Sequence, residues 1–222
     1  FDVHFGGAEA NVGVALSGFG HTVGMVSALP DNPFGNAMLG ALRSRGVNTG
    51  AIQHGAGRMG LYFLETGAVR RPSRIVYDRA HSVFAQTPTS AYDWDKLLDG
   101  ADWLHLSGIT PAVGPEPAKA AQAAVRAARK AGVKVAFDGN YRQALWEAWG
   151  GDGPGVLHDI LSQTDTAFIN ERDIALILGE TFSARKDAIK RAFAEFPALS
   201  MIACTTRSQT SVETQTLTGE VY

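Results

Sequence analysis

A short polar segment, Asp138 to Arg142, carries a carboxylate, an amide and a guanidinium within five residues. It directly follows the apolar run 133–137, which has the length and composition of a buried strand. In an open parallel sheet, ligands bind beyond the carboxyl ends of the strands, where an arginine can donate paired hydrogen bonds to a carboxylate or phosphate. The segment therefore predicts an anion site. Asp138 or Asn140 could instead cap the next helix, and the spacing does not separate these alternatives.

Two glycines, Gly6 and Gly7, stand directly before a predicted helix that carries Asn11. Backbone without side chains lets a ligand hydroxyl or carboxylate approach the positive end of a helix. Paired glycines also fit an ordinary tight turn, and the pattern alone favours that simpler interpretation.

The region from 52 to 79 combines tyrosines with an excess of arginines. Tyr62, Tyr77 and Arg79 could close over a ligand, and one or two of the arginines could clamp an anion. A charged strand edge also prevents edge-to-edge association, which is the alternative explanation for most of these arginines. The other arginines nearby are Arg70, Arg71 and Arg74.

A further polar group, Asn170 to Asp173, follows the apolar run 166–169. Hydrated Mg²⁺ beside nucleotide phosphates prefers oxygen ligands, which this group supplies. The same residues fit a helix N-cap followed by acidic residues in the first turn, so the sequence leaves both interpretations open.

Composition narrows the possible functions of these 222 residues. A net charge of -2 gives no global reason to bind nucleic acid or an anionic membrane, so an anionic ligand requires local cations. One cysteine, Cys204, excludes a disulfide within the chain and a paired-cysteine metal site, which favours a reducing cytoplasm. No apolar run of membrane-spanning length occurs, and no P-loop signature is present. The chain starts without Met, and we expect both of its ends to be cut.

The elements that position these groups alternate between strands and helices. We expect strands at 1–5 and 23–29 with helices at 8–19 and 34–45, then short β-type runs between 52 and 77 without helical periodicity. The later part returns to the strand and helix alternation of a parallel sheet with helices on both faces. Its predicted strands are 103–107, 133–137, 166–169 and 200–205, and its helices lie near 116–130, 141–148, 156–162, 171–178 and 184–195.

This order predicts an α/β core over residues 1–50 and 80–222 and a small β-rich lid over 51–79, which the first strand could join. In order and spacing, Gly6 to Val12, Asp31 to Gly35, the β-type insertion and Asp138 with Asn140 and Arg142 resemble the PfkB, or ribokinase-type, carbohydrate kinases. The segments 60–65, 71–79 and 140–146 resemble in particular the branch that phosphorylates 2-keto-3-deoxygluconate.

The resemblance implies roles for individual residues. Gly7 and Asn11 would contact substrate hydroxyls, Tyr62 and Tyr77 would close over the sugar, and Arg79 and Arg142 would bind its carboxylate. Asn140, Arg142 and Asn170 would lie near the nucleotide and the transferred phosphate. Asp173 stands where the family has a glutamate associated with Mg²⁺, so any metal contact would run through water.

The resemblance implies the fold, the cofactors ATP and Mg²⁺, and transfer of a phosphate to the 6-position of the sugar acid. It also implies a Gly-Ala-Gly-Asp segment that supplies the catalytic base, and this chain contains no such segment. Two alternatives stay open: another sugar kinase of the family, such as a fructokinase or ribokinase, and a non-catalytic sugar-binding or regulatory relative. Lids in this family often pair in a homodimer, for which one apolar face of Leu61, Phe63, Ile75 and Val76 is expected.

Overall fold

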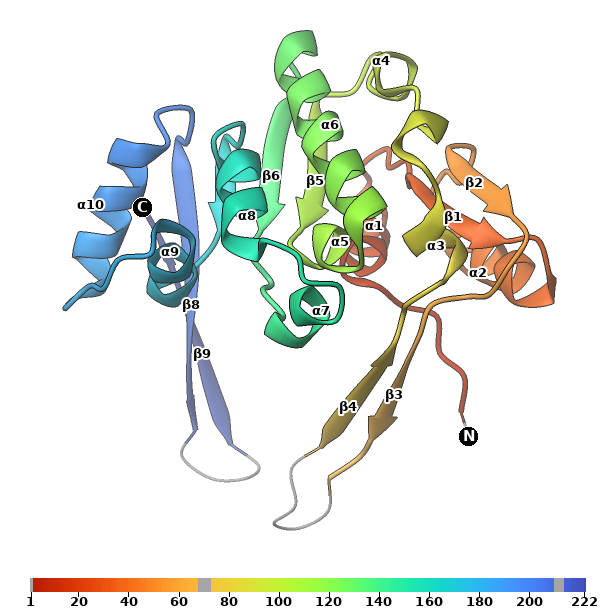
Figure 1. Cartoon of the computed structure of the whole chain (residues 1–222), viewed down its shortest axis with the longest axis horizontal. Coiled ribbons are helices and arrows are strands. Elements are labelled where there is room, and N and C mark those ends of the chain that lie inside the picture. Colours follow the sequence, from red (N-terminus) through yellow and green to blue (C-terminus); the bar gives the residue numbers. More distant parts are fainter. Residues whose placement is uncertain (1, 68–72, 210–213) are drawn as a thin grey trace. The chain divides into compact units, whose positions relative to one another are not determined.

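The computed structural model describes residues 2–67, 73–209 and 214–222 (Figure 1). The chain divides into two compact units. Unit 1 comprises Phe1–Ala91 with Val113–Pro117, and unit 2 comprises Tyr92–Ala112 with Ala118–Tyr222. The sequence predicted an α/β fold of the ribokinase type with a mostly parallel sheet. Both units combine helices with parallel strands, as predicted.

Unit 1 begins with α1 (Ala8–Gly18), β1 (Ser27–Pro30), α2 (Pro33–Arg43) and β2 (Ile52–Gly55), and its two strands pair in parallel. The side chain of Asn32 accepts hydrogen bonds from the amides of Phe34 and Gly35 at 3.0 and 3.1 Å, which fixes the start of α2 as its Asp-Asn-Pro sequence predicts. A small core lies between these elements. Its buried members are Ala10, Leu29, Leu39, Leu42, Val47 and Ile52.

Two predictions for this unit need correction. Residues 2–5 form no strand in the described structure, although their side chains alternate. A strand requires a hydrogen-bonded neighbour, and no backbone pairing is recorded for this segment. The segment 52–55, assigned to the lid from sequence, pairs with β1 and so belongs to the sheet.

The lid itself is a hairpin of β3 (Leu61–Glu65) and β4 (Arg74–Asp78), which extends away from β1 and β2 in Figure 1. Two short helical segments follow it, α3 (Val83–Gln86) and η1 (Thr89–Ala91). One or two of the arginines in this region were expected to clamp an anion, and two of them, Arg70 and Arg71, lie outside the described residues.

The register of the hairpin decides which residues share a face. Tyr62 lies opposite Tyr77, and Leu64 lies opposite Ile75. Because successive strand residues point to opposite faces, Ile75 shares the face of the tyrosines. The expectation that Ile75 joins an apolar face with the other three residues is therefore wrong. That opposite face carries Leu61, Phe63 and Val76, which are 43%, 50% and 47% exposed.

Unit 2 is built on the sheet order β5-β6-β7-β8-β9, parallel except for the last strand. Its strands are β5 (Trp103–Ser107), β6 (Lys134–Asp138), β7 (Thr166–Phe168), β8 (Met201–Gln209) and β9 (Gln215–Val221). Its helices are α4 (Trp94–Leu97), α5 (Ile109–Ala112), α6 (Pro115–Ala131), α7 (Gln143–Glu147), α8 (Gly153–Leu161), α9 (Glu171–Leu178) and α10 (Arg185–Glu195). The predicted parallel strands are confirmed.

The core of unit 2 lies around the central strands, where Val135, Phe137, Ala167 and Ile202 are fully buried. Figure 1 shows α6 and α8 on the near side of this sheet. The hairpin of β8 and β9 is longer than the strand predicted at 200–205. The described side chains of its outer part are exposed and mostly polar, so this part lacks the apolar periodicity on which that prediction depended. Within the described residues, no helix has the length and apolarity needed to cross a membrane.

Candidate functional site

In unit 1, the lid hairpin reaches the glycine turn that precedes α1. A Cβ atom placed on Gly6 would lie 3.8 Å from the hydroxyl oxygen of Tyr62 and 3.7 Å from Oδ1 of Asn11. Gly7 is the N-cap of α1 and makes no side-chain cap hydrogen bond. A tyrosine hydroxyl, an amide and bare backbone thus lie around one point at a helix N-terminus, an arrangement suited to a ligand rich in hydroxyl groups.

Arg79 lies against both tyrosines of the hairpin. Its guanidinium carbon is 4.9 Å from the ring centroid of Tyr77 and 6.0 Å from that of Tyr62. A cation at these distances from an aromatic ring is attracted by it, so the cross-strand tyrosine pair holds the guanidinium in place. We call Gly6, Asn11, Tyr62, Tyr77 and Arg79 the hairpin cluster. It brings together four of the residues predicted from sequence for substrate binding and lies next to a fifth, Gly7.

A second group, in unit 2, lies where β5, β6 and β7 end. The amide of Gly108 donates to the carbonyl of Asp138 at 2.8 Å, and the amide of Gly139 donates to the carbonyl of Phe168 at 3.0 Å. These bonds continue the sheet pairing past the strand ends and place the polar segments after β6 and β7 beside each other. Asn140 has a φ of 36°, a left-handed conformation that an asparagine tolerates better than most residues.

Asn170 and Asp173 form a capping box at the start of α9. Oδ1 of Asn170 accepts from the amides of Arg172 and Asp173 at 2.8 and 3.3 Å, and Oδ2 of Asp173 accepts from the amide of Asn170 at 3.0 Å. The helix-cap interpretation of these residues is confirmed. Asp173 also faces Gly139, because a Cβ on that glycine would lie 3.3 Å from its carboxyl carbon.

Arg142 belongs to the same group of side chains. Its Nη1 donates to the carbonyl of Tyr141 at 2.8 Å, and its charge acts to lower the pKa of Asp173. Arg142 is itself the N-cap of α7, without a side-chain cap hydrogen bond. The alternative in which Asp138 or Asn140 caps this helix is therefore wrong. We call Asn140, Arg142, Asn170 and Asp173 the strand-end cluster, and an exposed guanidinium within it is available to an anion.

A Mg²⁺ ion can be held here only in part by the protein. Among residues 2–67, 73–209 and 214–222, no three His, Cys, Asp or Glu side chains gather into a metal site. Asp173 offers one carboxylate, of which Oδ2 already accepts a backbone hydrogen bond. Mg²⁺ commonly keeps several waters and takes its other ligands from substrate phosphates, so a water-mediated role of Asp173 fits and stays a prediction.

The pKa of Asp173 gives a stability prediction. Burial is the main cause that raises this pKa above its ordinary value, with the charge of Glu171 adding to it. A carboxyl whose pKa is raised on folding stabilises the folded state most below its unfolded-state pKa, and that contribution is lost as pH rises. We expect Asp173→Asn, which cannot titrate at this position, to gain stability relative to the wild type as pH rises. The gain should begin near pH 3.8, the ordinary pKa of an aspartate, and extend upward.

Urea unfolding of both full-length proteins at several pH values from about 4 to 7 measures this difference. Asp152→Asn is a matched control, because Asp152 also caps a helix, α8, and is exposed. A pH-independent difference between Asp173→Asn and the wild type would contradict the prediction.

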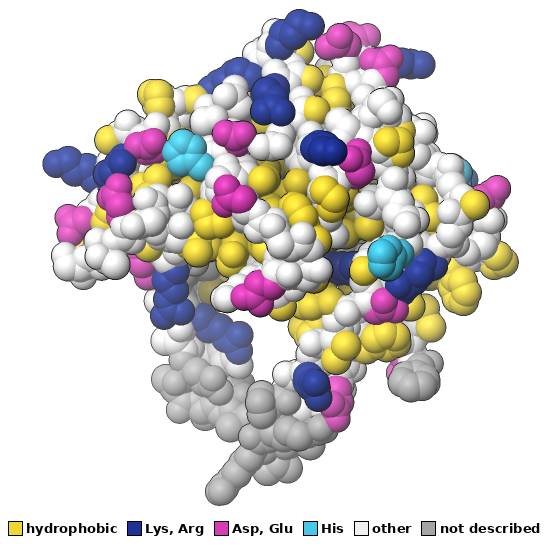
Figure 2. All heavy atoms as spheres, viewed as in Figure 1, with side chains coloured by type: hydrophobic (Ala, Val, Ile, Leu, Met, Phe, Trp, Pro, Cys, Tyr) yellow, Lys and Arg dark blue, Asp and Glu magenta, His cyan; other side chains and the backbone are white. Residues whose placement is uncertain are grey.

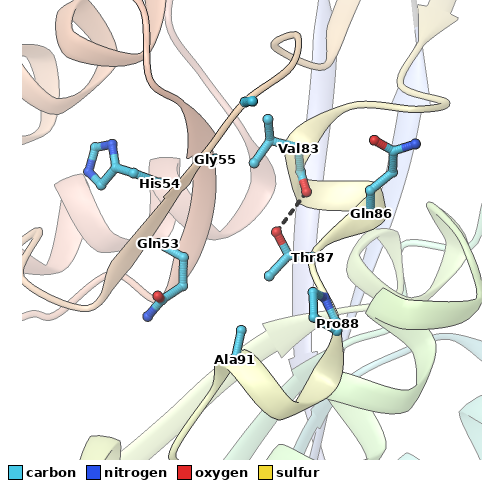
Figure 3. Close-up of a pocket in the computed structure, with 9 residues that line it drawn as sticks. Gln53, His54, Gly55, Val83, Gln86, Thr87, Pro88 and Ala91 are labelled. Atoms are coloured by element: carbon cyan, nitrogen blue, oxygen red, sulfur yellow. Dashed lines mark hydrogen bonds between the residues drawn. The ribbon is translucent and has the colours of Figure 1, made fainter.

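The structure also contains a cavity of about 280 Å³ in unit 1. Figure 3 shows it between β2 and α3, with the hydroxyl of Thr87 donating to the carbonyl of Val83 at 2.7 Å. None of its described lining residues is Lys, Arg, Asp or Glu, and none was predicted as a site residue. Its chemistry does not suit an acidic substrate. The lining consists of Gln53, His54, Gly55, Ala56, Val83, Gln86, Thr87, Pro88 and Ala91.

The two arginines predicted to share one carboxylate fall in different units, Arg79 in unit 1 and Arg142 in unit 2. Their joint role stays a prediction. Arg58 and Asp78 form an ion pair at the base of the lid, a contact that was not predicted from sequence. They are 20 positions apart in the sequence, so the fold brings them together.

Comparisons with known proteins point to one family. The family described as pfkB family carbohydrate kinase matches residues 1–209. A 2-dehydro-3-deoxygalactonokinase of Haloferax volcanii is 33% identical over 172 residues, which are 78% of this chain and 53% of that protein. A 2-dehydro-3-deoxygluconokinase of Dickeya dadantii is 32% identical over 184 residues, covering 79% of this chain and 59% of the relative. The chain thus spans little more than half the length of these curated relatives.

A solved structure gives the same result. The 2-dehydro-3-deoxygluconokinase of Thermotoga maritima superimposes with a TM-score of 0.91 at 37% identity, covering 100% of this chain and 69% of that one. The likeness therefore extends over both units and over the lid.

Proposed function

Because the chain belongs to the pfkB family of carbohydrate kinases, we propose that the full-length protein phosphorylates 2-keto-3-deoxygluconate at its 6-position, with ATP as donor and Mg²⁺ as cofactor. 2-Dehydro-3-deoxygluconate is another name for the same acid. The single observation that carries the choice of an acidic sugar is the position of Arg79, held by two tyrosine rings beside the hydroxyl-binding groups at Gly6 and Asn11.

The hairpin cluster supplies what a sugar acid needs. A guanidinium can donate two parallel hydrogen bonds to a carboxylate, and a lysine could not reproduce that planar geometry. The tyrosine hydroxyls and the amide of Asn11 can bind the hydroxyl groups of the same ligand. The backbone of Gly7 and the uncapped start of α1 add donors without steric bulk.

The strand-end cluster suits the phosphate side of the reaction. In the proposed step, the 6-hydroxyl oxygen of the sugar bonds to the γ-phosphorus, the bond from that phosphorus to ADP breaks, and the hydroxyl proton passes to a base. Such transfers depend mainly on alignment and on neutralising charge, which Arg142 and Asn140 can provide at the phosphoryl group. Bound Mg²⁺ would neutralise phosphate charge, with Asp173 and Asn170 holding its waters. The base is not assigned to a residue of this chain.

A coupled assay of ADP release by the full-length protein tests this proposal, with 2-keto-3-deoxygluconate, its galactonate epimer, fructose and ribose compared at equal concentration. We expect kcat/KM for the sugar acids to exceed that for fructose and ribose by at least about tenfold, the effect of 1.4 kcal/mol. A preference for fructose or ribose would refute the acidic substrate and favour the alternative sugar kinase. The epimer is included because both acids carry the carboxylate that Arg79 would bind.

A different outcome would support a non-catalytic relative. Calorimetric binding of 2-keto-3-deoxygluconate without any ADP release in the presence of ATP and Mg²⁺ would identify the protein as a sugar-binding or regulatory member of the family. The same protein samples serve both measurements, so the two functions are distinguished directly.

We also propose a cytoplasmic location and a homodimer paired through the lid. The face formed by Leu61, Phe63 and Val76 is apolar and exposed, and Figure 2 shows hydrophobic side chains at the surface around the base of the hairpin. Three adjacent apolar side chains on an exposed strand pair are typical of a surface that a partner covers. Sedimentation velocity measures the state directly, and a purely monomeric full-length protein would contradict the dimer.

A further inference from the structure

At the base of the lid, the side chain of Arg58 binds the backbone on both sides of Arg79. Its Nη2 donates to the carbonyl of Asp78 at 3.1 Å, and its Nη1 donates to the carbonyl of Ala80 at 3.1 Å. These two carbonyl groups flank Arg79 in the chain. The guanidinium of Arg58 therefore binds a backbone carbonyl group in the residue before and in the residue after the one that lies against the tyrosines.

Arg58 also forms a two-point ion pair with the carboxylate of Asp78. Nη1 donates to Oδ1 at 2.7 Å, and Nη2 donates to Oδ2. This pairing lowers the pKa of Asp78, mainly through the hydrogen bonds from Arg58, so the carboxylate stays charged at neutral pH. All four recorded side-chain bonds of Arg58 go to residues 78 and 80, which leaves it a structural cation rather than a ligand for substrate.

Backbone contacts reinforce the same junction. The amide of Val83 donates to the carbonyl of Arg58 at 3.0 Å, and the amide of Ser82 donates to the carbonyl of Arg79 at 3.3 Å. His81 between them has a φ of 56°, a conformation that costs energy for a residue other than glycine. Such a backbone persists only where its surroundings determine it, and here the surroundings are the bonds made by Arg58 and Ser82.

We propose that Arg58 is a positioning residue for substrate binding: it locks the segment 78–80 so that Arg79 stays against Tyr62 and Tyr77, aimed at the carboxylate of the substrate. This inference rests on the proposed function for its substrate and on the described geometry for its mechanism. Arg58 itself would touch no reacting group, and it would act through Arg79.

Arg58 is expected to affect the position of Arg79 much more than the stability of the folded protein. Arg58 and Asp78 have side chains that are 39% and 45% exposed, and exposed ion pairs contribute little to folding because water screens them. Loss of the pair should therefore leave the unfolding midpoint nearly unchanged. The position of Arg79, by contrast, should change, because both of its neighbouring carbonyl groups lose their donor.

The kinetic test uses Arg58→Met in the full-length protein. We expect KM for 2-keto-3-deoxygluconate to rise about tenfold, as expected for a misplaced charged donor, while kcat and KM for ATP stay within about twofold. Arg58→Lys should recover part of the loss, because one ammonium can bond to Asp78 but cannot reach both carbonyl groups as a fork does. Arg74 is exposed and lies on the face of the same hairpin opposite to Tyr77, away from the hairpin cluster, so Arg74→Met is the matched control and should leave KM unchanged.

A second measurement does not depend on turnover. The side-chain Nε–H resonance of Arg79 in the wild type should carry a ring-current shift from the two tyrosines, and in Arg58→Met it should move toward that of a solvent-exposed arginine. An unchanged Arg79 resonance in Arg58→Met would overturn the inference, whether or not the protein phosphorylates a sugar acid. An inactive wild type whose Arg79 resonance still moves in the variant would refute the proposed function and leave the positioning role supported.

Discussion

Replacing Arg79 with methionine is expected to lower kcat/KM for 2-keto-3-deoxygluconate about 100-fold, the size of effect that follows from losing about 2–3 kcal/mol of charged hydrogen bonding. Arg79 is the cation of the hairpin cluster, and its guanidinium is held 4.9 Å from the ring of Tyr77. Methionine keeps much of the apolar length of the side chain and its packing against the rings. The loss therefore reports the missing charge and hydrogen bonds.

The loss should depend on the substrate. A sugar without a carboxylate has no partner for the guanidinium, so any kcat/KM for fructose should change little in Arg79→Met. Arg79→Lys should be intermediate, because an ammonium keeps the charge and loses the planar pair of donors. Steady-state kinetics of the three full-length proteins with both substrates measures these differences.

Arg74→Met again provides the control for charge on the hairpin. Arg74 lies opposite Glu65 near the end of the paired strands, and its side chain is exposed. If Arg74→Met and Arg79→Met reduced kcat/KM equally, the effect would arise from the net charge of the lid. An equal loss on fructose and on the acid would likewise remove Arg79 from carboxylate recognition.

Local sequence patterns predicted much of the fold because they are short-range. Asn32 with Pro33 predicts the start of α2, and Asn170 with Asp173 predicts the start of α9, since a cap involves residues within one turn. The buried strands β5, β6 and β7 were found from apolar runs for the same reason. The segment 2–5 was predicted wrongly because alternating apolar and polar side chains are compatible with a strand but do not show whether a neighbouring strand is present to pair with it.

Long-range pairing explains what could not be predicted in the site. Arg58 and Asp78 are separated by the whole lid, and their ion pair depends on the register of β3 against β4. Tyr62 and Tyr77 were predicted as site residues from a family resemblance, but that they lie opposite each other is a property of the register. The capping box accounts for the positions of Asn170 and Asp173, so their place in the fold follows from local sequence.

The second prediction concerns Gly108, which we expect to tolerate no side chain. A Cβ atom here would lie 2.0 Å from the carbonyl oxygen of Gly139 and 3.2 Å from its carbonyl carbon. Carbon contacts are favourable only near 3.5–4.0 Å, so the two backbones would have to separate by more than about 1 Å. Backbone atoms cannot rotate away as a flexible side chain can. The adjacent bond from the amide of Gly108 to the carbonyl of Asp138 would be strained as well.

Gly108→Ala should therefore affect both stability and activity. Overpacking of this kind costs about 1–3 kcal/mol, which lowers the urea midpoint of unfolding. The displaced segment leads directly into Asn140 and Arg142, and a shift of about 1 Å in groups that align a reaction can reduce the rate about 100-fold. We expect kcat/KM for the sugar acid to fall by about this factor under conditions where the variant is fully folded.

Gly219→Ala separates this effect from the general consequence of replacing a glycine. Gly219 lies in β9 of the same unit, and a Cβ there would meet no other atom within 4 Å. It should keep wild-type activity and an equal or slightly higher urea midpoint, because alanine has less freedom to lose on folding. A folded, fully active Gly108→Ala protein would mean that the ends of β5 and β6 adjust without moving Asn140 and Arg142, and it would refute the prediction that Gly108 tolerates no side chain.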